Sequence, residues 1–92
     1  MIKSFKHKGL EKFFSSGKTA GIQPAHKNKL RMRLAALDTA TTIKDMNLPG
    51  FNLHSLKGKL KGIWAIDVSG NWRITFKFKD GDVFIVNYED YH

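Results

Sequence analysis

Cysteine is absent from the chain, which excludes disulfides, thiolate zinc sites and a cysteine nucleophile. Long apolar runs are also missing: no segment approaches the roughly 20 apolar residues that cross a bilayer, and residues 1–8 lack the apolar stretch of a signal peptide. The four histidines do not show metal-ligand spacing. We therefore expect a cytoplasmic protein without a metal, another cofactor or a membrane partner.

The sequence also lacks the motifs of several large enzyme classes. It contains no G-x-S-x-G motif and no glycine-rich phosphate loop of the Walker or Rossmann type. Serine hydrolases with a nucleophile elbow and nucleotide-binding enzymes are thereby set aside. The length of 92 residues, 41% of them hydrophobic, is that of one globular domain covering residues 1–92.

Acidic residues are scarce, and the imbalance is concentrated near the N-terminus. The chain has 16 Lys and Arg against 8 Asp and Glu, a net charge of +8. Between Met1 and Arg33 there are nine basic residues and one acidic residue, Glu11. This distribution favours a polyanionic partner such as RNA. The alternative is that lysine-rich helix faces only keep a small protein soluble.

Hydrophobic periodicity predicts helices in the N-terminal half. Leu10, Phe13 and Phe14 share one helical face, which predicts a helix over about 7–16 that ends at Gly17. A second stripe of leucines predicts a helix from Pro24 to about Asp38. A short strand at 2–5 is compatible with the sequence, and the segment 39–50 reads as a connection with room for one helical turn.

From Phe51 onward the apolar period changes to two, which indicates strands. Keeping the apolar residues on one face requires a three-residue loop, 69–71, which pairs Val68 with Trp72 and Asp67 with Arg73. The Asp-Gly turn at 80–81 pairs Lys79 with Asp82, and the same register carries on to pair Phe76 with Ile85 and Arg73 with Tyr88. Asp90 and His92 would continue the face of Arg73. The pattern predicts an α+β fold of two N-terminal helices packed on a curved, mainly antiparallel β-sheet.

The side chains near the end of this sheet suit RNA cleavage without a metal. In that reaction the 2′-hydroxyl attacks the neighbouring phosphate, so it needs a base, an acid for the 5′-oxygen, and positive charge. Proton transfer can come from His54, Asp90, Tyr91 and His92, and positive charge from Lys57 and Arg73. Structural roles are the alternative for each of them; Arg73, for example, could simply pair with Asp67.

Several segments, taken in order, resemble the HigB-type toxins of the RelE/ParE superfamily. They are Met1-Ile2-Lys3-Ser4-Phe5, Leu37-Asp38-Thr39-Ala40-Thr41, Leu53-His54-Ser55-Leu56-Lys57-Gly58, Gly62-Ile63-Trp64-Ala65-Ile66, Asn71-Trp72-Arg73-Ile74-Thr75-Phe76 and Asn87-Tyr88-Glu89-Asp90-Tyr91-His92. The resemblance implies a RelE/ParE-like fold and a bacterial toxin that cleaves translated mRNA in the ribosomal A site. It also implies inhibition by a HigA-type helix-turn-helix antitoxin. The toxin would contact operator DNA only indirectly, through this antitoxin.

The family's functional positions fall on His54, Lys57, Arg73, Asp90, Tyr91 and His92. Chemically, His92 is the better candidate base and Tyr91 or His54 the acid, because a histidine near pKa ~6.5 exchanges protons at neutral pH. Asp90 would orient an imidazole or the backbone. The family pattern places Tyr91 in the site, whereas strand alternation puts it on the other face unless the chain end twists. Many relatives have Arg or Thr in place of Asp67, which leaves open whether Asp67 restrains Arg73.

The remaining basic residues are candidates for gripping ribosomal RNA. Contacts to phosphates set position without reading sequence. The expected binding residues are Lys3, Lys6, Lys8, Lys27, Arg31, Lys59, Lys61 and Lys77. Two rival functions remain: a non-catalytic basic RNA-binding module, which has no need of Asp-Tyr-His at the terminus, and a ParE-like gyrase inhibitor on the same fold.

Overall fold

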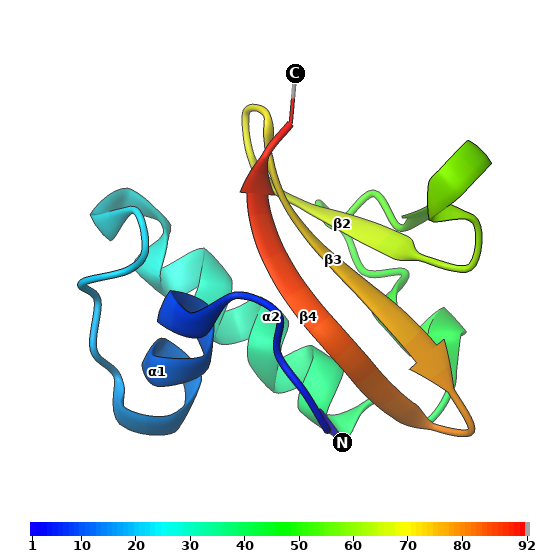
Figure 1. Ribbon diagram of the computed structural model, residues 1–92, viewed down its shortest axis with the longest axis horizontal. Coiled ribbons are helices and arrows are strands. Elements are labelled where there is room, and N and C mark those ends of the chain that lie inside the picture. The colour runs from blue at the N-terminus through cyan, green and yellow to red at the C-terminus, as the bar shows by residue number, and fades with distance from the viewer. Residues whose placement is uncertain (92) are drawn as a thin grey trace.

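The computed structural model describes residues 1–91 and has two helices beside one antiparallel sheet (Figure 1). The helices are α1 (Lys8–Ser16) and α2 (Lys27–Thr39), and the strands are β1 (His54–Ser55), β2 (Trp64–Ser69), β3 (Trp72–Lys79) and β4 (Asp82–Asp90), in that order across the sheet. Short 3₁₀ turns lie at η1 (Pro24–His26), η2 (Ile43–Met46) and η3 (Gly58–Leu60). The predicted α+β fold is confirmed. Within the described residues, no helix has the length and apolar character needed to cross a membrane.

Both predicted helices form, for the reasons that the sequence suggested. The His7 Nδ1 accepts a hydrogen bond from the Leu10 N–H at 2.9 Å and caps α1, and Gly17 ends it at φ 78°, a left-handed conformation that favours glycine. Pro24 opens η1, which leads directly into α2. The predicted turn in segment 39–50 is η2, where Thr42 and Asp45 form a capping box.

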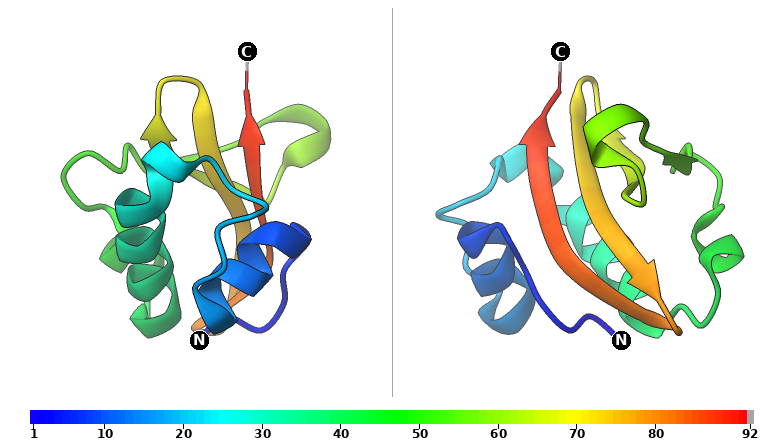
Figure 2. Two further views of the ribbon diagram at one scale, coloured as in Figure 1. Left: turned by 90° about the vertical axis from the view of Figure 1, so that its left-hand side faces the viewer. Right: turned by 45° about the vertical axis from the view of Figure 1, so that its right-hand side comes forward.

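One hydrophobic core joins the helices to the sheet. Leu30, Leu34 and Leu37 of α2 are buried against the sheet residues Ile66, Ile74, Phe76 and Val86. Each such side chain contributes about 1.5–3 kcal/mol on burial. In the right-hand view of Figure 2, α2 lies behind the strands and the turn around η3 lies in front of them. The sheet face that points away from α2, called the open face, is therefore only partly covered. Residues 2–5 run parallel to β4 and pair through Ile2 with Val83 and Phe5 with Val86.

The first hairpin departs from the predicted pairing at its tip. Asp67 pairs with Arg73 and Ile66 with Ile74 as expected, but Ser69, not Val68, lies opposite Trp72. The loop therefore has two residues, with Gly70 at φ 56° in its first position, as type II′ turns require. The register shifts between Asp67 and Ser69, which leaves Val68 as an extra residue in β2. The side chain of Val68 stays buried.

The second hairpin begins as predicted and then shifts by one residue. Lys79 pairs with Asp82 and Phe78 with Val83, but beyond Lys77 and Phe84 the next partners are Thr75 and Asn87. The predicted pairs Phe76 with Ile85 and Arg73 with Tyr88 are wrong. Ile85 sits at φ 49°, and its N–H donates to the Ser4 side chain at 2.8 Å. This β-bulge is held by the N-terminal segment, which no turn motif in the sequence reveals.

The bulge reverses the faces of the last five residues of β4. Arg73 lies opposite Glu89, and Ile74 lies opposite Tyr88, which is buried with the core. Asn87, Glu89 and Tyr91 consequently share the open face with Arg73. The prediction that Tyr88 and Asp90 lie on the face of Arg73 is therefore wrong, and Tyr91, which simple alternation puts on the opposite face, lies on the face of Arg73.

Arg33, one of the nine basic residues of the N-terminal third, is buried at 6% exposure. Its Nε donates to the Asp67 carbonyl at 2.6 Å, and its guanidinium lies 4.4 Å from the centre of the Phe51 ring. Burial lowers its pKa, although an arginine stays charged. Arg33 thus ties α2 to the end of β2, where the candidate site lies.

Candidate active site

A cavity of about 260 Å³ opens at the end of the sheet where β2 turns into β3. It is lined by Asn52, His54, Asp67, Gly70, Asn71, Trp72, Arg73 and Tyr91. Three predicted catalytic residues, His54, Arg73 and Tyr91, thus meet around one space although they lie on three separate segments. Its lining contains hydrogen-bond donors, an imidazole, a phenol and a cation, which are the groups that acid-base chemistry on a phosphate uses.

His54 has a defined tautomer when its ring is neutral. Its Nδ1 lies 2.7 Å from the Asn52 carbonyl oxygen, and a carbonyl only accepts, so the proton is on Nδ1. The Nε2 atom then carries the lone pair that a general base needs. Asn52 itself adopts φ 48°, a region that asparagine tolerates, and its Nδ2 donates to the Asp67 carboxylate at 3.1 Å.

The side chain of Arg73 forms an ion pair with Glu89 on β4 and not with Asp67, which lies opposite Arg73 on β2. Its Nε and Nη2 both donate to Glu89 Oε2, at 2.9 and 2.7 Å, and the residue is only 7% exposed. The carboxylate of Asp67 instead accepts from Asn52. The possible ion pair between Asp67 and Arg73 is therefore wrong, although the two residues lie opposite each other on β2 and β3. The β4 bulge brings Glu89 opposite Arg73 on the other side.

Tyr91 covers the guanidinium of Arg73. The centre of its ring lies 3.9 Å from the Arg73 Cζ atom, which is a cation–π contact. The Tyr91 N–H donates to the Asn71 carbonyl at 2.7 Å and continues the β3–β4 pairing past the end of β4. The ring is 57% exposed, so the phenol lies over Arg73 and remains accessible to a ligand.

A cluster of rings supports the site from the core side of the sheet. Trp72 stacks on Tyr88 at 4.6 Å, and His26 meets both rings edge-on. The Nδ1 of His26 lies 2.5 Å from the Tyr88 hydroxyl. Burial, with a smaller effect of Lys29, lowers the pKa of His26, and burial raises the pKa of Tyr88 despite an opposing backbone hydrogen bond at Gln23. A neutral imidazole therefore accepts from the phenol.

The other predicted catalytic residues lie away from the cavity lining or outside the described residues. Lys57 is exposed just before η3, three residues beyond His54. Asp90 lies opposite Trp72 at the end of β4, and its charge helps to raise the pKa of Tyr88. His92 lies outside the described residues. Among residues 1–91, His, Asp and Glu side chains form no group of three that could hold a metal ion.

All eight predicted RNA-contacting residues are exposed, but they are divided between the two layers. Lys27 and Arg31 belong to α2, whereas Lys77 faces a cleft beside Phe84 on the open face. Lys6 lines another open-face cleft together with Leu60 and Glu89. A polyanion that contacted all of them would have to cover the sheet edge and part of the helical layer.

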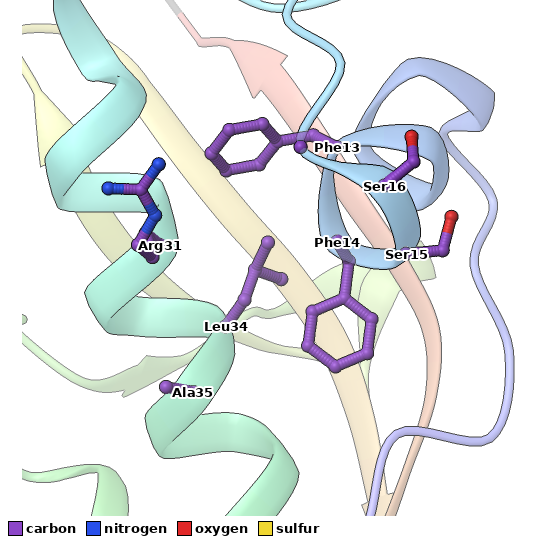
Figure 3. Close-up of a pocket in the computed structure, with 8 residues that line it drawn as sticks. Phe13, Phe14, Ser15, Ser16, Arg31, Leu34 and Ala35 are labelled. Carbon is purple, nitrogen blue, oxygen red and sulfur yellow. The ribbon is translucent and has the colours of Figure 1, made fainter.

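A second cavity, of about 400 Å³, lies between α1 and α2 (Figure 3). Phe13 and Leu34 point into the space between the helices, Phe14 lies on the α1 side, and Arg31 and Ala35 lie on the α2 side. It shares no residue with the cavity at His54. Arg31 is the titratable side chain of its lining, so this groove lacks an acid-base set.

Sequence reasoning missed Glu89 and Asn52, the two residues that hold Arg73 and His54. Glu89 was hidden because the bulge at Ile85 determines which face it occupies. Asn52 acts through its carbonyl and an unusual backbone conformation, which leave no side-chain pattern. Trp72 was counted only as an apolar residue of the core face, although it also lines the cavity.

Comparison with known proteins identifies the family. Residues 3–92 match the family described as the RelE-like toxin of the type II toxin-antitoxin system HigB. The chain belongs to this family. It is 52% identical to the endoribonuclease HigB of Proteus vulgaris over the whole of both chains, and 35% identical to the toxin HigB-1 of Vibrio cholerae, covering all of this chain and 98% of that one.

The fold has a counterpart among solved structures. A conserved hypothetical protein of Helicobacter pylori, known from its solution structure, superposes with a TM-score of 0.51 at 21% identity, covering 97% of this chain and 96% of that one. This likeness supports the RelE-like fold alone. Membership of a type II toxin family means that the HigB-like chain has a cognate antitoxin.

Proposed function

We propose that this HigB-like toxin is an endoribonuclease that cleaves translated mRNA in the ribosomal A site by acid-base transphosphorylation, without a metal. The observation that carries the proposal is the meeting of His54, Arg73 and Tyr91 around one cavity. The 52% identity to an enzyme named endoribonuclease HigB supports the RNA-cleaving activity. Action on ribosomes would take place in the cytoplasm and would inhibit translation.

In this mechanism a base removes the proton of the 2′-hydroxyl, whose oxygen then attacks the adjacent phosphorus. The bond from phosphorus to the 5′-oxygen breaks, and an acid protonates that oxygen, leaving a 2′,3′-cyclic phosphate and a 5′-hydroxyl. His54 suits the base because its Nε2 bears the lone pair in the neutral tautomer fixed by Asn52. The exposed phenol of Tyr91 suits the acid, since its O–H group can donate a proton to an oxygen that enters the cavity.

The other predicted residues complete the site. Lys57 is exposed and has a flexible stem, so its ammonium can reach a phosphate that enters the cavity. Asp90 orients the chain end near Tyr88 and Trp72. His92, which the sequence favours as the base, follows Tyr91 directly in the chain and is the alternative to His54 in that role. Positive charge beside the cavity stabilises the phosphorane, which carries more negative charge than the ground state.

The exposed lysines and Arg31 would hold the toxin on ribosomal RNA and mRNA. A HigA-type helix-turn-helix antitoxin is the partner that would restrain it, and operator DNA would be met only through that antitoxin. The net charge of +8 supports association with polyanions of this kind.

Primer extension on a message translated in a purified system tests the proposal. New RNA ends are expected only when the protein and ribosomes are both present, and His54→Ala should abolish them. Glu11→Gln is a control away from the cavity, because Glu11 is an exposed residue of α1 that pairs with Lys8 at 3.8 Å. RNA that is bound but not shortened would indicate the non-catalytic binding module, and inhibition of gyrase supercoiling without RNA cleavage would indicate the ParE-like alternative.

A further inference from the structure

Arg73 is buried and already paired within the protein, and binding a phosphate requires neither feature. It is 7% exposed, and two of its nitrogens are committed to one oxygen of Glu89. The other Glu89 oxygen accepts from Asn87 Nδ2 at 3.4 Å, so the carboxylate is also held from its far side. The positive charge is therefore balanced by a neighbouring carboxylate before any RNA arrives.

Tyr91 is the exposed residue next to the ion pair of Arg73 and Glu89, and its ring lies on the Arg73 guanidinium. A guanidinium is flat, and two hydrogen bonds to one carboxylate fix the direction in which its plane faces. A charged flat surface attracts an aromatic face and narrows the range of positions open to an exposed ring. The orientation of the Tyr91 ring thus depends on the residue that orients Arg73.

We propose that Glu89 is a positioning residue that acts through Arg73 to hold the phenol of Tyr91 over the cavity. The proposal rests on the proposed function of Tyr91 as the acid. A proton donor must lie within hydrogen-bond reach of the leaving oxygen, and a displacement of about 1 Å can cost roughly 100-fold in rate. The ion pair between Arg73 and Glu89 thereby fixes the geometry of the proton donor, in addition to the charge that Arg73 places beside the cavity.

Single-turnover cleavage at saturating toxin distinguishes a positioning role of Glu89 from a role in ribosome binding. Glu89→Gln keeps the size of the side chain but removes the charge, and we expect it to lower the rate by about 10- to 100-fold with the ribosome affinity unchanged. Glu11→Gln makes the same chemical change on an exposed carboxylate paired with Lys8 and should leave the rate unaltered.

The decisive comparison uses the Tyr91→Phe background. If Glu89 acts through the phenol of Tyr91, the double variant Glu89→Gln, Tyr91→Phe will be no slower than Tyr91→Phe alone. A further loss by the full factor of the single variant would mean that Glu89 acts independently, for example as a gate that leaves Arg73 when phosphate binds. That result would overturn the proposal.

A spectroscopic measurement tests the same idea without any cleavage. The chain has two tyrosines, so ring-labelled protein gives two sets of tyrosine NMR signals. Glu89→Gln should shift or broaden those of Tyr91, on the open face, and leave those of Tyr88, in the core, in place. Unchanged Tyr91 signals would overturn the proposal. Changed signals in a protein that does not cleave RNA would contradict the proposed function and leave the positioning intact.

Arg73→Lys guards against an effect of folding alone. Lysine can still pair with Glu89 but offers no flat surface to the ring, so we expect the same Tyr91 signals to change and the same lack of additivity with Tyr91→Phe. The proposal would be overturned if Glu89→Gln unfolds while Arg73→Lys remains folded and active, with unchanged Tyr91 signals. That result would show that the ion pair is only structural.

Discussion

Glu89 and Arg73 form an ion pair across β3 and β4, with the Nη2 atom of Arg73 2.7 Å from the Glu89 carboxylate. The pair exists because the bulge at Ile85 brings Glu89, and not Tyr88, opposite Arg73. It places a buried cation beneath Tyr91 and beside His54, at the one end of the sheet where β2 turns into β3.

Replacing Arg73 by alanine should lower single-turnover cleavage by roughly 100-fold or more. The change removes the support of Tyr91 and the positive charge beside the cavity, while the exposed lysines that would grip the ribosome remain. Cleavage and ribosome association should be measured on the same preparation. Equal losses in both would identify Arg73 as a docking residue.

Asp67→Thr should not raise the cleavage rate, because Arg73 pairs with Glu89 and the Asp67 carboxylate accepts from Asn52. Loss of that acceptor loosens the segment whose carbonyl orients His54, so we expect an unchanged or slightly lower rate. Single-turnover kinetics provide the measurement. An increase of several-fold would show that Asp67 does restrain Arg73 when RNA is bound.

Replacing Lys6, Lys8 and Arg31 with glutamine should weaken ribosome association and flatten its dependence on salt. Each lost phosphate contact removes roughly 0.7–0.9 from the slope of log affinity against log salt concentration. Chemistry in complexes that are already bound should survive. Normal binding at every salt concentration would assign this charge to solubility.

The buried His26 makes stability depend on pH in a defined direction. Its pKa lies below the usual ~6.5 in the folded state, so between the two values the unfolded chain binds more protons and stability rises with pH. The contribution is complete above about pH 6.5 and is lost as the pH falls below it.

Urea unfolding at pH 7.5 and pH 5.5 tests this. The wild-type free energy of unfolding should fall more over that interval than that of His26→Gln, which has no titrating ring at this position. The other histidines are common to both proteins, so their contributions to the change in the free energy of unfolding cancel in the comparison. An equal change in both proteins would remove His26 as the cause.

Deleting His92 alone should leave folding nearly unaffected, because the deletion keeps every residue of the apolar core and the residues that form the Tyr91 backbone bond to Asn71. If His92 is the base, cleavage should fall by roughly 100-fold or more. Thermal unfolding and ribosome-dependent cleavage should be measured together. Full activity without His92 would leave His54 as the base, and a collapsed melting temperature would make the terminus structural.

The sequence alone determined the helices, the strands and the residues that could perform the chemistry. Periodicity at Leu30, Leu34 and Leu37 predicts α2 because a helix face must be apolar along its length to be buried. The Asp-Gly turn predicts the start of the second hairpin because two positive φ angles are needed there. Local patterns of this kind act over a few residues, so the sequence displays them directly.

The tertiary structure decided which of these residues meet. A bulge of one residue at Ile85 exchanges the faces of β4, and it is held by Ser4, which is 81 residues away in the chain. Period-two reasoning cannot find it, because a strand with one extra residue shows the same alternation on either side of the shift. The burial of Arg33 likewise depends on distant segments, because the Asp67 carbonyl and the Phe51 ring make it favourable. Contacts between distant segments thus placed Tyr91 over Arg73.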